Sequence, residues 1–147
     1  MNILYPMFGM ILLSCFVVLA LYLSRLIPVI KNFGNLESAR YADDFRPLLP
    51  EKLRNITANY NHIFEQPTLF YATVIYIYLM NHGDMTNIVL AWGYVVFRSF
   101  HTIIQLTVNN VSMRVIPFIF SGICLILLIV KELLFFFRNL LITERLL

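Results

Sequence analysis

Four long apolar stretches, separated by polar segments, divide the chain. They run over residues 3–30, 57–80, 88–108 and 115–137. A helix of about 20 residues, rising 1.5 Å per residue, crosses the ~30 Å hydrocarbon core of a membrane. The first stretch lacks the basic leader and the small-residue cleavage site of a signal peptide, so we expect it to be retained. The pattern therefore predicts four membrane-spanning helices.

The connections between these stretches differ in length. Residues 81–84 and 109–112 are short polar turns, and His82 is interpreted as a turn residue. Residues 31–56 form a long connection with two prolines and charges of both signs, which belongs in water or among lipid headgroups. These features predict an all-α fold, with residues 1–147 forming a single membrane domain built as an up-down four-helix bundle.

The composition supports lipid as the solvent of this chain. Hydrophobic residues make up 60% of it and charged residues 13%, and the mean hydropathy is +0.78. An average soluble domain is about half apolar and a quarter charged, so a water-soluble globule is excluded. The net charge of +3 is too small and too dispersed for nucleic-acid binding. Neither cysteine lies at metal-ligand spacing from a histidine, so no metal site is expected.

Basic residues predict the orientation, because Lys and Arg near span ends are retained on the cytoplasmic side. Seven basic residues lie on the side of the 31–56 and 109–112 connections. They are Arg25, Lys31, Arg40, Arg46, Lys52, Arg54 and Arg114. The opposite side carries Lys131, Arg138 and Arg145. We therefore expect the 31–56 loop in the cytoplasm and both termini outside it.

A few ionisable side chains lie within the apolar stretches, where each costs roughly 2.5–3.5 kcal/mol on insertion scales. Arg98, His101 and Gln105 share one face of the third span. Glu65 precedes Pro67 in the second span and reaches a depth similar to that of Arg98. A buried charge without a partner is strongly destabilising. The spacing therefore predicts an ion pair between Glu65 and Arg98 inside the bundle.

Together with the basic residues at two span ends, these side chains predict a cationic, hydrogen-bonding cluster near the cytoplasmic face. Its predicted members are Arg25, Asn61, His62, Glu65, Arg98, His101, Gln105 and Arg114. Such a cluster suits a small anionic ligand that enters from the cytoplasm while its reacting end faces lipid. Two other interpretations remain open: Glu65 and Arg98 as a purely structural clamp, and Arg25 and Arg114 as interfacial anchors.

Two segments carry a family resemblance. NHIFEQPTLFYA at residues 61–72 and RSFHT at residues 98–102, with Arg114 beyond, resemble the MAPEG family, the membrane-associated proteins in eicosanoid and glutathione metabolism, in its bacterial branch. The resemblance covers residues 59–118. It implies a four-helix protomer assembled as a homotrimer in the bacterial inner membrane. It also implies glutathione as cosubstrate, held between subunits near the cytoplasmic side, and transferase, peroxidase or isomerase activity on lipophilic substrates.

The resemblance assigns roles to individual residues. Glu65 and Arg98 would belong to the buried polar network, and His101 to the glutathione pocket. Arg114 would bind and activate the thiol, which makes it the expected catalytic residue. Arg25 would contribute at the end of the first span.

Two hypotheses follow. The first is a glutathione-dependent transferase or peroxidase that acts on lipophilic electrophiles, with membrane lipids, lipophilic small molecules and copies of itself as partners. The second is a non-catalytic membrane scaffold or lipid-binding protein that keeps the bundle and its polar clamp. Gln105 and Phe118, where some members of the family have pocket tyrosines, favour the second. A proton or ion pathway through Glu65 and His101 is a third possibility, although the chain offers only one charged layer.

Overall fold

The computed structural model describes residues 2–32, 55–56, 59–60 and 63–146, with the backbone alone for residues 24–32 and 143–146. Four helices account for most of the described chain. They are α1 (Leu4–Asn32), α4 (Pro67–Leu79), α5 (Met85–Leu106) and α6 (Val111–Leu146). No described residue lies in a strand, so the all-α prediction is confirmed. The predicted loop at residues 31–56 falls almost entirely outside the described residues.

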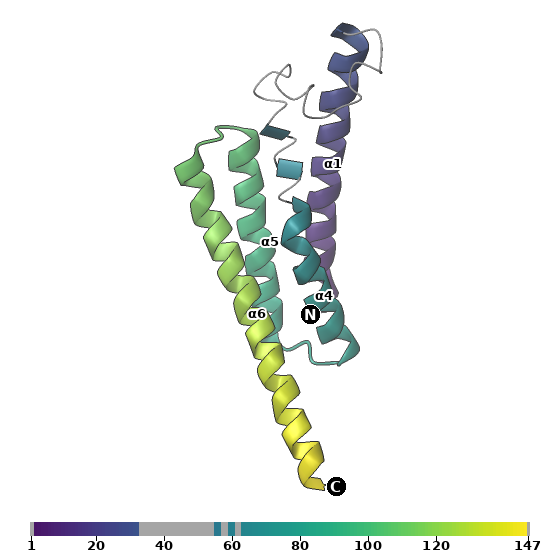
Figure 1. Cartoon of the computed structure of the whole chain (residues 1–147), viewed down its shortest axis with the longest axis vertical. Helices are drawn as coiled ribbons and strands as arrows, with labels where there is room; N and C mark the ends of the chain where they lie inside the picture. Colours follow the sequence, from purple (N-terminus) through teal and green to yellow (C-terminus); the bar gives the residue numbers. More distant parts are fainter. Residues whose placement is uncertain (1, 33–54, 57–58, 61–62, 147) are drawn as a thin grey trace.

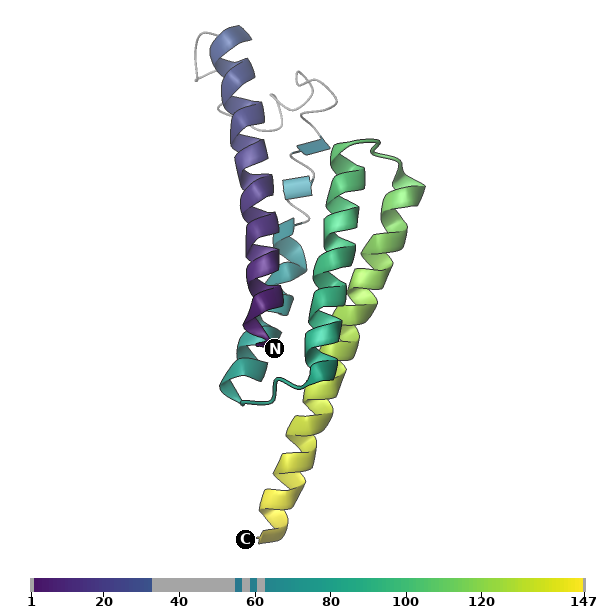
Figure 2. The ribbon, with the colours of Figure 1, turned by 180° about the vertical axis from the view of Figure 1, so that it is seen from behind.

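The four helices lie side by side, and consecutive helices run in opposite directions (Figure 1). The α5–α6 pair makes the most extensive contact, while α1 packs on α4 and α5. The C-terminal part of α6 projects past the turn between α4 and α5, as Figure 2 shows from behind. The up-down order of the predicted bundle is thus present in the protomer.

Three helices contain segments that are long and apolar enough to cross a membrane: Leu4–Leu23, Met85–Leu106 and Val111–Ile142. They confirm the first, third and fourth predicted spans, with shifted ends. The predicted span at residues 57–80 is not among them. Its uninterrupted helix α4 has 13 residues, which rise only about 20 Å. Residues 63–65 are helical ahead of it, but residues 57–58 and 61–62 are not described, so this span stays a prediction.

A proline sets the start of α4. Pro67 occupies the first position of the helix, where its missing N–H would have no intrahelical acceptor in any case. Gln66 precedes it as a bend between two helical segments. The Thr68 hydroxyl donates a hydrogen bond of 2.7 Å to the backbone carbonyl of Glu65. The helix therefore restarts at Pro67, and this changes which side chain of the preceding turn faces α5.

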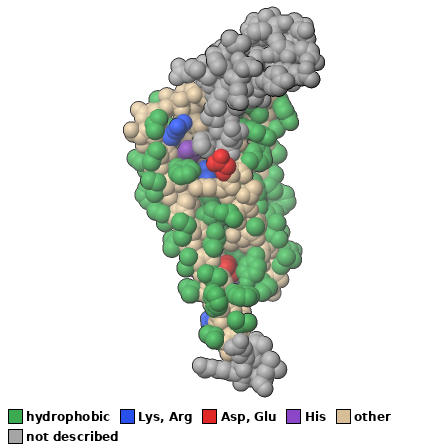
Figure 3. Space-filling model, in the orientation of Figure 1, with side chains coloured by type: hydrophobic (Ala, Val, Ile, Leu, Met, Phe, Trp, Pro, Cys, Tyr) green, Lys and Arg blue, Asp and Glu red, His purple; other side chains and the backbone are tan. Residues whose placement is uncertain are grey.

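Apolar side chains from all four helices form the core, and others cover the outside. Phe70 stacks on Tyr94, with ring centroids 4.5 Å apart. A Cβ at Gly9 would lie 3.3 Å from the Trp92 ring, so glycine permits the close approach of α1 to α5. Large apolar side chains are also exposed along α1, α5 and α6, and Figure 3 shows them covering much of one face of the molecule. An apolar exterior over an apolar core is the pattern expected in lipid.

The turn between α4 and α5 is fixed by Asp84. Its carboxylate caps α5 by accepting a hydrogen bond of 2.8 Å from the Asn87 backbone N–H. The Lys131 ammonium of α6 donates to the same carboxylate at 2.6 Å. Burial alone would raise the pKa of Asp84, but the bonds from Lys131 and Asn87 hold that pKa below its ordinary value of 3.8. Asp84 therefore joins the start of α5 to α6 in its charged form.

Two substitutions at Asp84 should destabilise the protein by different amounts. We expect Asp84→Ala, which removes both the cap and the ion pair, to lower the free energy of unfolding by about 1 kcal/mol. Asp84→Asn keeps a capping oxygen and loses only the charge, so its loss should be smaller. Unfolding in detergent at pH 7 would measure both variants.

The pH dependence of the same variants gives a control. A carboxylate whose pKa is lowered on folding contributes its full stability above the unfolded pKa and loses it as the pH falls through the folded pKa. The wild type should therefore approach Asp84→Asn in stability as the pH falls below 3.8. If Asp84→Ala unfolds at the wild-type midpoint at pH 7, Asp84 does not hold the two helices together.

Candidate functional site

A buried arginine lies within α5. The side chain of Arg98 is 1% exposed. Its Nε donates a hydrogen bond of 3.3 Å to the Tyr94 hydroxyl, and its Nη2 donates to the Gln66 side-chain oxygen. The rings of Tyr94 and Phe118 lie 5.7 Å and 5.3 Å from the guanidinium carbon. The charge is thus enclosed by two oxygen acceptors and two aromatic faces.

The hydrogen bonds of Arg98 go to Gln66 and Tyr94 rather than to an acid. The predicted ion pair between Glu65 and Arg98 stays a prediction. The Glu65 side chain is exposed on the protomer surface. Because the helix restarts at Pro67, the residue after Glu65 faces α5. The prediction that Arg98 lies inside the bundle is confirmed.

His101 links α5 to the beginning of α6. It is 6% exposed, and its Nδ1 lies 2.9 Å from the backbone carbonyl of Arg114. A carbonyl only accepts, so Nδ1 carries the proton. The Phe118 ring lies 5.6 Å from the imidazole. Arg114 is half-buried, and its Nη1 donates to the Asn109 side-chain oxygen at 3.0 Å. This end of the α5–α6 pair therefore presents a histidine and an arginine together.

Two buried amide side chains have polar atoms without a hydrogen-bond partner among the described residues. Gln105 is fully buried, and neither its amide nitrogen nor its amide oxygen has a hydrogen-bond partner among the described residues. The amide nitrogen of Asn59, which is 1% exposed, has none either. A buried polar group without a partner costs about 1–3 kcal/mol. Such groups are expected where a ligand or a second subunit completes a site.

The structure brings together part of the predicted cluster. The members that share one end of the bundle are Arg98, His101, Gln105 and Arg114. Figure 3 shows basic, histidine and acidic side chains gathered on one face near the end where α5 and α6 join. Asn61 and His62 lie outside the described residues, and Arg25 lies on α1 with its side chain not described.

A second polar network, which the sequence did not predict, lies at the opposite end of the same helix pair. Glu132 of α6 is 4% exposed. It accepts hydrogen bonds from Asn87 Nδ2 at 2.9 Å and from His82 Nδ1 at 3.2 Å. Lys131 donates to the Asn87 side-chain oxygen at 2.8 Å. His82 is thus a partner of a buried acid as well as a turn residue. An acid within an apolar stretch is the signal that could have indicated this network.

Comparison with known protein families shows which family the chain matches. The family model described as MAPEG family matches residues 3–134. No curated protein and no solved structure matches the chain significantly. The matched range includes both polar networks, and it extends the resemblance at residues 59–118 over most of the chain.

The contact between Gln66 and Arg98 predicts a stability difference between two variants. Gln66→Leu removes an acceptor from a buried guanidinium and should lower the free energy of unfolding by about 2 kcal/mol, the value of a hydrogen bond to a charged group. Gln66→Glu keeps the acceptor and should lose less. Denaturation of both variants in detergent would compare them. Equal losses would show that the Gln66 oxygen does not support Arg98.

Proposed function

This chain belongs to the MAPEG family of membrane proteins, and we propose that it binds glutathione and acts as a transferase or peroxidase on lipophilic electrophiles. The observation that carries the proposal is the buried cluster of Arg98, His101 and Gln105 beside Arg114. A membrane helix keeps such groups in its interior only at considerable cost, so they mark a site by default. Many members of the family use glutathione.

The chemistry of the cluster fits this ligand. Glutathione carries two carboxylates and several amide groups, which require cations and hydrogen-bonding partners. Arg114 uses one guanidinium nitrogen for Asn109, which leaves the remaining nitrogens available for a carboxylate or a thiolate. Gln105 offers both a donor and an acceptor that no described residue uses. These residues can therefore hold a polar, anionic molecule at the membrane boundary.

Arg114 is the proposed catalytic residue. A cation beside a thiol lowers the thiol pKa and raises the fraction of thiolate, which is the nucleophile. The thiol proton would pass to water, and the thiolate sulfur would then bond to the electrophilic carbon of the substrate. In an aryl chloride, the bond from that carbon to chlorine breaks and chloride leaves into water. The bilayer supplies the apolar electrophile laterally, while glutathione enters from the cytoplasm. Arg98 would support the site from inside the bundle through its contact with Gln66.

We further propose that the working form is a homotrimer in the bacterial inner membrane, with the 31–56 loop in the cytoplasm and both termini outside it. In that assembly a neighbouring subunit would supply part of each site. Gln105 and Asn59, which lack partners among the described residues, are candidates for contacts of this kind. Arg25, Asn61, His62 and Glu65 remain predicted members of the same site.

A non-catalytic role is the second candidate. Arg98 is satisfied within the chain by Gln66 and by the rings of Tyr94 and Phe118, as a structural clamp would be. Phe118 beside His101 carries no hydroxyl for a thiol. These two observations favour a membrane scaffold or lipid-binding protein that keeps the fold without the reaction.

Glutathione binding can be tested before chemistry. A ligand at about 100 times its dissociation constant stabilises the folded state by about 2.7 kcal/mol. We expect glutathione to raise the unfolding midpoint of the detergent-purified protein, and Gln105→Leu to abolish that rise. Arg138→Ala, at the other end of the bundle, is the matched control and should keep it. The absence of a shift at saturating glutathione would favour the scaffold.

The role of Arg114 can be tested by turnover. With glutathione and a lipophilic aryl chloride, Arg114→Ala should lower the rate at pH 7 by about tenfold or more, because the thiol pKa then rises by about one unit. Raising the pH should restore much of the rate, since the thiolate then forms without the cation. Turnover of the variant at the wild-type rate at pH 7 would remove Arg114 from the mechanism.

A further inference from the structure

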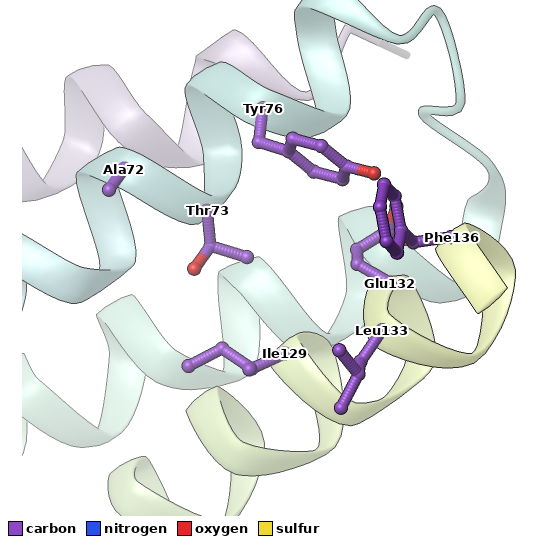
Figure 4. Close-up of a pocket in the computed structure, with 7 residues that line it drawn as sticks. All are labelled: Ala72, Thr73, Tyr76, Ile129, Glu132, Leu133 and Phe136. Atoms are coloured by element: carbon purple, nitrogen blue, oxygen red, sulfur yellow. The ribbon is translucent and has the colours of Figure 1, made fainter. Parts of the chain in front are cut away.

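A cavity of about 340 Å³ opens between α4 and α6, away from the cluster around Arg98. Figure 4 shows Thr73 and Tyr76 on its α4 side and Glu132, Leu133 and Phe136 on its α6 side. Its volume lies within the range of small-molecule sites, about 300–1,000 Å³. The glutathione site proposed above uses none of these residues.

The cavity contains a hydrogen-bond donor, the Tyr76 hydroxyl, that no described residue uses. The hydroxyl oxygen of Tyr76 is buried and has no hydrogen-bond partner among the described residues. Buried tyrosine hydroxyls usually have one. Figure 4 shows this hydroxyl pointing toward the α6 side of the cavity, where Phe136 and Glu132 lie. The hydroxyl of Thr73, in contrast, donates to the backbone carbonyl of Leu69 at 2.8 Å.

The same cavity also contains an acceptor. Glu132 is 4% exposed, and its bonds from Asn87 and His82 occupy only part of the roughly four lone-pair positions of a carboxylate. The Lys131 Nζ lies 3.9 Å from Glu132 Oε1 but 2.6 Å from Asp84 Oδ2, so its closer carboxylate is that of Asp84. Glu132 can therefore accept one further hydrogen bond from inside the cavity.

The rim of the cavity is apolar. Leu133 is 51% exposed and Phe136 is 47% exposed. Both belong to the segment of α6 that is apolar enough to lie in a membrane. A ligand that enters here must therefore carry a hydrocarbon part that remains in contact with lipid.

We propose that this cavity, an open groove between α4 and α6, binds a membrane-dissolved lipophilic alcohol. The alcohol hydroxyl accepts a hydrogen bond from Tyr76 and donates one to Glu132. A hydroxyl is the smallest neutral group that does both. An anionic head would be repelled by Glu132, and an ammonium head has no lone pair to accept from Tyr76. The hydrocarbon part of the alcohol leaves the groove past Leu133 and Phe136.

Photolabelling of the full chain in phospholipid nanodiscs tests the proposal. The probe is a long-chain alcohol with a diazirine in its chain, and the reference is the alkane of the same length without the hydroxyl. We expect the alcohol to label the groove residues of α4 and α6 about tenfold more than the alkane, the effect of one to two net hydrogen bonds. Mass spectrometry of the peptides locates the label.

Two variants separate hydrogen bonding from general contact with lipid. Tyr76→Phe keeps the ring and should reduce alcohol labelling to the level of the alkane. Tyr78→Phe removes an exposed hydroxyl from the same helix and should leave the labelling unchanged. Alkane labelling that stays constant across the variants shows that they remain folded.

Several results would overturn the proposal. Equal labelling by alcohol and alkane, or alcohol labelling that survives in Tyr76→Phe, would show that no polar head is bound. Stronger labelling by a long-chain amine would show that the ligand is cationic. Absent labelling together with crosslinks between chains across the groove would show that a second copy of the chain covers it.

Discussion

The enclosure of one guanidinium is the constraint on which the rest of the site depends. Arginine stays charged at any pH that a protein meets, so α5 can carry Arg98 through a membrane only if its neighbours surround it. The surrounding groups come from three elements: Gln66 ahead of α4, Tyr94 on α5 and Phe118 on α6. Their convergence brings the three elements together at one depth. His101, one turn further along α5, is then joined to the start of α6 through the Arg114 carbonyl.

The helices were predictable because lipid leaves few alternatives. Within hydrocarbon every backbone polar group must be bonded inside its own segment, so a long apolar stretch has to be helical. The burial of Arg98 and Gln105 also followed from spacing alone, because i and i+7 share a helix face. The hydrogen-bond partner of Arg98, in contrast, could not be predicted from the spacing. Its identity depends on how the chain restarts at Pro67, where Gln66 is brought into hydrogen-bonding contact with Arg98.

The network at the other end was missed for a different reason. Glu132 and His82 are far apart in the sequence, and their contact depends on the register of α6 against the turn before α5. Apolar periodicity reports which face of a helix is buried, but not which turn of one helix lies beside which turn of another. Lys131 and Glu132 were visible as charges in an apolar stretch. Of the two, only Lys131 entered the predicted orientation, as a basic residue near a span end.

The spacing of the two networks along α5 fits a bilayer whose polar boundaries lie near them. On α5, Asp84 and Gln105 are separated by about 32 Å of helix rise, close to the ~30 Å thickness of a hydrocarbon core. Along α5, Arg98 then lies about 21 Å from the boundary near Asp84 and only about 10 Å from the boundary near Gln105. At that depth a polar molecule can reach the cluster from water, while its other end remains beside lipid chains. A conjugation reaction between a water-soluble thiol and a lipid-soluble electrophile requires this position, whereas a structural clamp would serve equally well at the centre of the membrane.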